Sequence, residues 1–539
     1  MGRESESRKV RKSERKGCDS FFLSSFHFLD SWFLALASYD EVQRENFQNK
    51  PVYCYFTDMI DHSAKKQIHD ADFLYMQIAD RLGSQIRQLL LKTGEKLPSV
   101  RALSQEQGIS LSTAYKAYVQ LEMNGLIEAR PKSGYYVRYT PARSFDQHKV
   151  EKQPEANKRS VDQMIAMVYR HFSSDSIVKL SRASPALSLL PQAKLNKSMM
   201  EAIRLSPNSC INYEEIQGNE HLRKHIARHA FSWSGNILPE DVVTTQGCME
   251  ALVFCLRAVT KPGDVVAIES PAYFGIFTIV QSLGLKILEI PTDPNDGLDL
   301  DFLRKAITEH QIKACLFVPT FSNPLGYCMT NDKKKELVEL LAENEVPLIE
   351  DDIYGEMYFE KTRPRTCKSY DQHGLVMLCS SVSKTLAPGY RVGWCIPGKF
   401  KTEVINLKLM QTLSSATPTQ AAIGNFFETG RYDLHMRNLR KKLHSQCLRY
   451  TQAIAEYFPE DIKISRPRGG YVLWIELNKK VDAFELYEQA LNYNISISPG
   501  QIFSTDSRFT HFIRISFGIP YDEEIEKSLK TLGELIHKF

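Results

Sequence analysis

Short apolar runs alternate with amphipathic stretches over about residues 240–400, and this alternation restricts the chain to few folds. The runs at 265–269, 286–290, 314–318, 347–351 and 376–380 are typical of buried strands, and helical patterns at 301–310 and 332–344 lie between them. Such a pattern predicts an α/β domain with a mainly parallel sheet and helices on both faces. Because ligands bind at the carboxyl ends of such strands, the residues after each run are candidate site residues.

A lysine stands just after the last of these runs, in the segment Ser381-Val-Ser-Lys-Thr-Leu-Ala-Pro-Gly-Tyr-Arg391. The amine of Lys384 can form an imine with an aldehyde. Ser381, Ser383 and Arg391 supply hydroxyls and a guanidinium, which are groups that bind phosphate. The segment therefore predicts a site for an aldehyde that carries a phosphate.

Three further segments place polar groups near the ends of other runs. Asp351 ends one run and Tyr354 follows it; a carboxylate that faces a pyridine nitrogen keeps it protonated and makes the ring an electron sink. Asn323 offers an amide after the run at 314–318. Gly247 begins a helix, where backbone N–H groups and the helix dipole favour a phosphate. Together these segments predict pyridoxal 5′-phosphate as the cofactor.

A different pattern occupies residues 71–140. Apolar residues recur at helical spacing from Leu74, Pro98 suits the first turn of a second helix, and Ser110 is a good N-cap for a third. Two short β-like runs at 126–130 and 135–138 follow. Three helices followed by a hairpin predict a winged helix-turn-helix, in which the third helix can enter the major groove. From 75 to 140 there are nine Lys/Arg and five Asp/Glu, which accounts for the whole chain's net charge of +4.

The segment LPSVRALSQEQGISLSTAYKAYVQLEMNGLIEARPKSGYYV, residues 97–137, resembles the GntR-type winged-helix domain over its full length. The resemblance implies that double-stranded promoter DNA is the partner. Members of that family often have Arg where this chain has Leu111 and Tyr115. A three-helix interaction module that binds no DNA is the alternative. The residues expected to meet DNA are Arg101, Ser110, Ser112, Thr113, Tyr115, Lys116 and Gly134, with 112, 113, 115 and 116 on the exposed face of the third helix.

The stretch from about residue 213 to the C-terminus is similar to the fold-type I aminotransferases, in their kynurenine/aminoadipate-like branch. The resemblance implies that Lys384 forms the Schiff base and that Asp351 is the partner of the pyridine nitrogen. Tyr354 and Asn323 are then donors to the ring hydroxyl, and the catalytic residues that the resemblance implies are Lys384, Asp351 and Tyr354. Each motif is common by itself, but all of them occur in the family's order, which favours the cofactor interpretation.

The same resemblance implies that Tyr273 stacks on the cofactor ring and that Arg514 binds an amino-acid carboxylate as a bidentate fork. Two segments depart from the family. Residues 247–249 read Gly-Cys-Met where Ser or Ala and then a polar residue are usual, so side-chain phosphate bonds are expected to be lost there, and 184–191 departs from the usual entrance motif. The other residues implied to hold the cofactor are Gly247, Cys248, Met249, Ser381, Ser383, Arg391 and, from the partner subunit, Tyr213.

The two domains together resemble the MocR subfamily of bacterial regulators. That resemblance implies a homodimer, a small amino-acid or amine effector that is sensed through aldimine exchange at Lys384, and a winged helix that acts on a promoter. An aminotransferase with a fused DNA-binding domain is the alternative, since the set of Lys384, Asp351 and Arg514 is complete. A cofactor-free dimeriser is a third interpretation.

The chain's 539 residues suggest two or three domains, and its apolar, aromatic and charged fractions of 43%, 10% and 24% exclude a mainly disordered or fibrous chain. We expect a winged helix at 71–140, a linker at 141–176 and the cofactor domain at 177–539, with a small subdomain from about 430. The eleven scattered cysteines lack a CxxC pair, which predicts reduced thiols in a cytoplasm and no metal site.

Residues 1–70 have the order of a secretory signal, because seven Lys/Arg between 3 and 16 precede a largely apolar stretch at 21–37. His27 and Asp30 interrupt that stretch, and seventeen residues are short for a membrane span. We therefore expect a poorly structured leader or a start assigned upstream of the true one, with Met59 as an alternative start, and no membrane partner.

Overall fold

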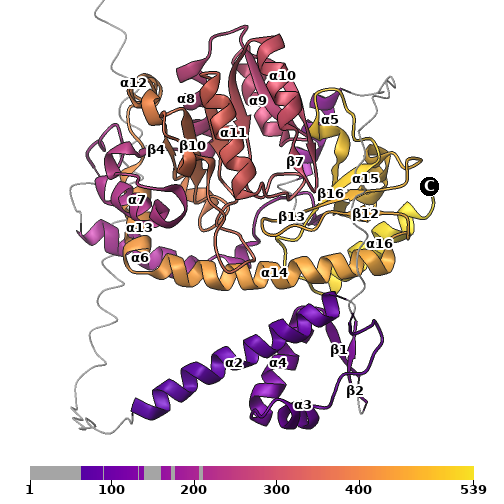
Figure 1. Cartoon of the computed structure of the whole chain (residues 1–539). Coiled ribbons are helices and arrows are strands. Elements are labelled where there is room, and N and C mark those ends of the chain that lie inside the picture. Colours follow the sequence, from indigo (N-terminus) through magenta and orange to yellow (C-terminus); the bar gives the residue numbers. More distant parts are fainter. Residues whose placement is uncertain (1–61, 89, 131–132, 139–159, 172–175, 206–210) are drawn as a thin grey trace, which may run out of the picture. The chain divides into compact units, whose positions relative to one another are not determined.

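The computed structural model describes residues 62–88, 90–130, 133–138, 160–171, 176–205 and 211–539 (Figure 1), with side chains from residue 74 onward. The predicted leader up to residue 61 and the linker residues 139–159 and 172–175 lie outside this range. Within the described part, every helix is too short or too polar to cross a membrane.

The N-terminal domain contains the predicted three helices and hairpin. These are α2 (His62–Arg87), α3 (Val100–Glu106), α4 (Leu111–Met123), β1 (Ile127–Arg130) and β2 (Gly134–Val137). The hydroxyls of Ser99 and Ser110 cap α3 and α4 by accepting from backbone N–H groups three residues on. A separate core, which includes Ile86, Leu103 and Leu121, holds the helices together. This arrangement confirms the predicted winged helix-turn-helix.

An eight-stranded sheet forms the centre of the second domain (Figure 1), with the strand order β4-β11-β10-β9-β8-β5-β6-β7. The five predicted strands are all present and pair in parallel as β10-β9-β8-β5-β6. At the edges, β11 runs antiparallel to both β10 and β4, and β7 runs antiparallel to β6. The bounds are β4 (Val243–Thr245), β5 (Val265–Ser270), β6 (Lys286–Asp293), β7 (Gly297–Leu298), β8 (Ile312–Phe317), β9 (Leu348–Asp351), β10 (Val376–Ser381) and β11 (Gly393–Ile396).

Helices cover both faces of this sheet, as predicted. Alternate strand residues point to opposite sides, so Ile268 belongs to one apolar core and Ala267 to another. Helices α8 (Cys248–Val259) and α9 (Phe274–Ser282) pack into the first core, while α10 (Leu300–His310) and α11 (Asn331–Glu343) pack into the second. The fold class is therefore α/β, with helices on both faces of a mixed but mostly parallel sheet.

The C-terminal part has its own four-stranded antiparallel sheet, with the order β12-β13-β16-β15. Its strands are β12 (Lys463–Ile464), β13 (Val472–Glu476), β15 (Ser498–Pro499) and β16 (Phe512–Ser516). The helices of this part are α14 (Arg431–Tyr457), α15 (Ala483–Leu491) and α16 (Glu523–Ile536).

Two segments between residues 160 and 180 join these two parts, and the first of them lies within the range 141–176 predicted as linker. Helix α5 (Val161–Arg170) buries Met164 and Val168 in the main core, and β3 (Val178–Lys179) pairs in parallel with β14 (Ile495–Ser496). The remaining helices are α6 (Gln192–Leu205), α7 (Glu220–Ser234), α12 (Lys401–Gln411) and α13 (Thr417–Glu428).

Candidate functional site

The residues predicted to hold the cofactor come from the carboxyl ends of adjacent strands. Asp351 ends β9, and Lys384 follows β10 by three residues. These two strands are neighbours in the sheet, with Cys379 of β10 opposite Asp351. Asn323 follows β8 on the other side of β9. The topology therefore brings together groups that are up to 61 residues apart in the sequence.

The amine of Lys384 donates a hydrogen bond to the carbonyl oxygen of Ala183 at 2.8 Å. Desolvation by burial, and then the positive charges of Arg514 and Arg182, lower the pKa of Lys384 from 10.5 to about 8. The hydroxyl of Tyr471 donates to the backbone carbonyl of Lys384 at 2.6 Å and fixes the chain at that point. A lysine whose pKa is lowered in this way has more of the neutral amine that attacks an aldehyde.

Asp351 is buried, and its carboxylate accepts from the thiol of Cys248 at 3.3 Å and from the N–H of Ile353 at 3.1 Å. Burial raises the pKa of Asp351 from 3.8 to about 6, although both hydrogen bonds oppose the rise. Burial also raises the pKa of the Cys248 thiol, which therefore stays protonated and donates. The side chain of Cys248 thus supports the predicted partner of the pyridine nitrogen.

A chain of hydrogen bonds joins the two sheets at this site. The amide of Asn323 donates to the Tyr354 hydroxyl at 3.4 Å, and its oxygen accepts from Arg514 at 3.0 Å. Arg514 lies on β16 and also donates to the Ser498 hydroxyl at 2.8 Å and to the Ser181 carbonyl. Its Nε is buried without a partner among the described atoms, and burial lowers the pKa of Arg514 to about 10. A buried guanidinium with an unused N–H suits a carboxylate ligand.

Residues around Gly247 form a cradle in which a side chain would not fit. Gly247 has a φ of 90°, and a Cβ placed there would lie 2.3 Å from the guanidinium of Arg391. That guanidinium donates to Ser383 Oγ at 3.4 Å and to the Gln246 carbonyl at 2.9 Å, and the N–H of Ser383 donates to Ser381 Oγ at 3.2 Å. Hydroxyls, a guanidinium and the start of α8 together are a donor set that fits a phosphate.

The two tyrosines that are predicted to contact the cofactor ring or its phosphate, Tyr273 and Tyr213, lie in different surroundings. Tyr273 precedes α9, and its hydroxyl lies 3.1 Å from that of Tyr169 on α5. Tyr213 is 84% exposed, and no contact described in the single chain brings it to Lys384. Met249 is also partly exposed, at 39%. The assignment of Tyr213 to a partner's site therefore stays a prediction.

The residues predicted to contact DNA lie on α3, α4 and the wing. Arg101, Ser112, Tyr115 and Lys116 are exposed, as are Ser110 and Gly134. Thr113 departs from the expected exposed face, because it is only 7% exposed and its hydroxyl hydrogen-bonds that of Ser110 at 2.7 Å. Thr113 lies on the buried side of α4 together with Ala114, and its hydroxyl contacts the N-cap residue of that helix.

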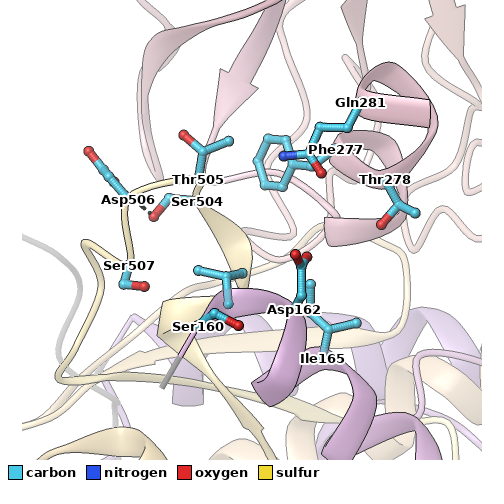
Figure 2. Close-up of a pocket in the computed structure, with 11 residues that line it drawn as sticks. Ser160, Asp162, Ile165, Phe277, Thr278, Gln281, Ser504, Thr505, Asp506 and Ser507 are labelled. Atoms are coloured by element: carbon cyan, nitrogen blue, oxygen red, sulfur yellow. Dashed lines mark hydrogen bonds between the residues drawn. The ribbon is translucent and has the colours of Figure 1, made fainter. Parts of the chain in front are cut away.

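A cavity of about 420 Å³ lies between α5, α9 and residues 504–507 (Figure 2). Its polar lining includes Asp162 of α5 and Gln281 of α9, while Ile165 and Phe277 supply the apolar part. The described residues that line it include none of the predicted cofactor residues. Helix α5 therefore borders this cavity and, through Tyr169, also meets Tyr273 of the cofactor site.

Several members of the site could not be predicted from the sequence. The carbonyl of Ala183 and the charge of Arg182 act on Lys384 from a segment 200 residues away, and a backbone carbonyl leaves no signal in the sequence. The hydrogen bond from Cys248 to Asp351 spans 103 residues. The only signal near this segment is the departure of residues 184–191 from the family's usual entrance motif.

Comparison with known proteins matches each of the two domains to a family. The profile of bacterial regulatory proteins of the gntR family matches residues 74–137, and that of aminotransferase class I and II matches residues 179–532. The solved structure of the Pyrococcus horikoshii kynurenine aminotransferase, in complex with PMP, has a TM-score of 0.64 and 26% identity. It covers 72% of this chain and 95% of its own.

Two relatives match the chain across both domains. The HTH-type transcriptional regulators YdcR and YjiR of Escherichia coli (strain K12) are 38% and 36% identical to this chain. Each match covers 86% of this chain and 99% of the relative. The cofactor of the aminotransferase class I and II domain is pyridoxal 5′-phosphate, which the lysine, the buried carboxylate and the phosphate cradle fit. The chain therefore belongs to the aminotransferase class I and II family and, with its gntR-family domain, to the MocR-like HTH-type transcriptional regulators that fuse the two.

Proposed function

We propose that this protein regulates transcription by binding promoter DNA through its winged helix and by sensing an amino acid or amine at Lys384. The observation that carries the proposal is the position of α5, the first described helix after the winged-helix domain, which lies within the range 141–176 predicted as linker. Met164 and Val168 anchor α5 in the main core, and Tyr169 places its hydroxyl 3.1 Å from that of Tyr273. The chain that leads to the DNA-binding domain thus begins at the predicted cofactor site.

When bound, pyridoxal 5′-phosphate supplies an aldehyde carbon that can be exchanged between Lys384 and the amino group of an effector. Lys384 would attack that aldehyde only as the neutral amine, and its lowered pKa supports that role. Asp351 would hold the proton of the pyridine nitrogen, and Arg514 would orient the carboxylate of an amino-acid effector. The cradle of Gly247, Ser383 and Arg391 would bind the phosphate.

Two contacts of these residues lead back toward the linker. The free amine of Lys384 is hydrogen-bonded to the Ala183 carbonyl, in the segment that follows β3, so bonding to the cofactor must give up this contact. Tyr273, whose ring is predicted to stack on the cofactor, is hydrogen-bonded through its hydroxyl to the hydroxyl of Tyr169 on α5. An effector that alters either contact favours one conformation of these segments over another, and differential affinity is what shifts such an equilibrium.

We also propose that the protein acts as a homodimer in the bacterial cytoplasm, where its promoter DNA lies. The exposure of Tyr213 supports the dimer, because a tyrosine destined for a partner's site must project from its own chain. Turnover as an aminotransferase is the alternative function, and one set of assays distinguishes the two.

The test compares the wild-type chain, Lys384→Ala and the matched control Lys399→Ala, which removes an exposed lysine from the same domain. DNase footprints of the gene's upstream region are recorded with each amino acid or amine in turn. We expect the wild type and the control to be yellow and to change their footprint with one effector class. Lys384→Ala should be colourless and should give the same footprint with and without it.

Steady-state assays with amino acids and 2-oxoglutarate complete the design. Absence of turnover together with an effector-dependent footprint supports the regulator. Turnover at rates typical of enzymes, with a footprint that ignores the effector, would favour the aminotransferase. An effector response that survives unchanged in Lys384→Ala would show that the sensor model is wrong.

A further inference from the structure

Helix α7 carries three histidines at a spacing of four residues, His221, His225 and His229, so that they lie along one face. The third is already committed, because its Nε2 lies 3.1 Å from a carboxylate oxygen of Glu356. The first two face the last turn of α13, where Glu428 stands. His229 is thus paired with Glu356, whereas His221 and His225 form a separate group with Glu428 of α13.

The separations within this second group are close to those of a metal site. His221 Nε2 and Glu428 Oε2 are 3.4 Å apart, which matches the edge of about 3.4 Å between two ligands of tetrahedral Zn²⁺. One nitrogen of each histidine and one oxygen of Glu428 all lie within 4.8 Å of one another. The side chains of His221 and Glu428 are 43% and 55% exposed, so small rotations can close the remaining distance and water can supply a fourth ligand.

A glycine on α13 makes room for this arrangement. Gly424 lies one turn before Glu428, and a Cβ placed there would come within 2.7 Å of His221 Nδ1. Any larger residue would therefore push the His221 ring away from the helix that carries the carboxylate. The ring of His225 packs edge to face against that of His221, with centroids 4.7 Å apart, so the two imidazoles are neighbours on the helix surface.

We propose that His221, His225 and Glu428 form a binding site for Zn²⁺ or a similar divalent transition metal that clamps α7 to α13. Two imidazoles from one helical face and a carboxylate from a second helix are ligands that Zn²⁺ prefers. The site is separate from the cofactor residues. Its role would be structural. The N–H of Asn219, the N-cap of α7, already donates to Gln420 of α13 at 3.0 Å, and the metal would add a second link between the same two helices. Because α7 begins just after the segment of Tyr213, this link would also hold the helix next to that segment. The sequence alone could not predict this site, since its third ligand lies 203 residues from the nearer histidine.

The test uses the full, untagged chain after dialysis against a chelator. Zn²⁺ is titrated by calorimetry, and Co²⁺ is added in parallel because its visible spectrum reports tetrahedral coordination. We expect one equivalent to bind to the wild type. His225→Ala and Glu428→Gln should bind more than about tenfold more weakly. The matched control is His310→Ala. It removes an exposed histidine whose Nε2 lies 4.0 Å from Glu309 and which, among the described residues, belongs to no group of three possible metal ligands. This variant should bind Zn²⁺ as tightly as the wild type does.

Gly424→Ala is a second variant that is compatible with the helix, because alanine favours helical backbone. It should weaken Zn²⁺ binding by displacing the His221 ring, while circular dichroism stays unchanged. Zn²⁺ should also raise the melting temperature of the wild type and not that of His225→Ala. The proposal is overturned if the wild type binds no Zn²⁺, or if His225→Ala and Glu428→Gln retain the full equivalent, as they would if thiols elsewhere held the metal.

Discussion

The lowered pKa of Lys384 predicts how the capture of pyridoxal 5′-phosphate depends on pH. With a pKa of about 8, about one amine in ten is neutral at pH 7, whereas a pKa of 10.5 would leave about one in three thousand. The site therefore offers about 300 times more of the reactive amine than an exposed lysine does. The rate of capture should rise about tenfold per pH unit up to about pH 8 and level off above it.

The assay mixes apoprotein with excess cofactor in a stopped-flow instrument and follows the yellow colour from pH 6 to 10. Arg182→Gln is the perturbing variant, since Arg182 is exposed and its charge is one cause of the low pKa. Removing that charge should move the break in the profile to higher pH and slow capture at pH 7. Lys384→Ala should show no colour. A rate that keeps rising tenfold per unit to pH 10 in the wild type would refute the reasoning.

Three further predictions follow from the geometry. Cys248→Ala removes the thiol that donates to Asp351, a hydrogen bond that lowers the pKa of this carboxyl, so that pKa should rise further above about 6. Absorbance titration should then show cofactor binding about fivefold weaker at pH 6.5, with a smaller loss at pH 8, where the carboxylate is ionised in both proteins. Gly247→Ala places a Cβ 2.3 Å from the guanidinium of Arg391 at a φ of 90°, and should weaken cofactor binding more than about tenfold while gel shifts with DNA stay unchanged. Leu121→Ala opens a cavity at a fully buried position and should destabilise the winged helix by about 2–5 kcal/mol. It should abolish the gel shift and leave the cofactor spectrum intact, because the two domains have separate cores.

The sequence predicted the parts of the fold that local patterns determine. All five strands of the parallel sheet and the helices of the winged domain came from apolar periodicity and capping residues. Lys384, Asp351 and Asn323 could also be grouped, because the carboxyl ends of parallel strands meet at one edge of the sheet. These inferences needed only the chain order and a rule about topology.

The remaining features depend on side-chain direction and on contacts between distant segments. Thr113 is buried next to Ala114 and contacts the hydroxyl of Ser110, and periodicity cannot resolve one position at the edge of a helix face. The contact between Lys384 and the Ala183 carbonyl involves a backbone atom that every residue possesses. Glu428 meets His221 only because α13 packs against α7, which no local pattern indicates.

Cys248 shows how such a distant contact changes the interpretation of a motif. Its departure from the family motif predicts the loss of a side-chain bond to the phosphate. In the structure the thiol instead donates to the carboxylate of Asp351. That carboxylate has a pKa of about 6 and the amine of Lys384 one of about 8, so above pH 8 the first is charged and the second is neutral, as cofactor capture requires. Without the Cys248 bond the pKa of Asp351 would rise toward that of Lys384. Cys248 therefore helps to keep the carboxylate ionised at a pH where part of the lysine is still protonated.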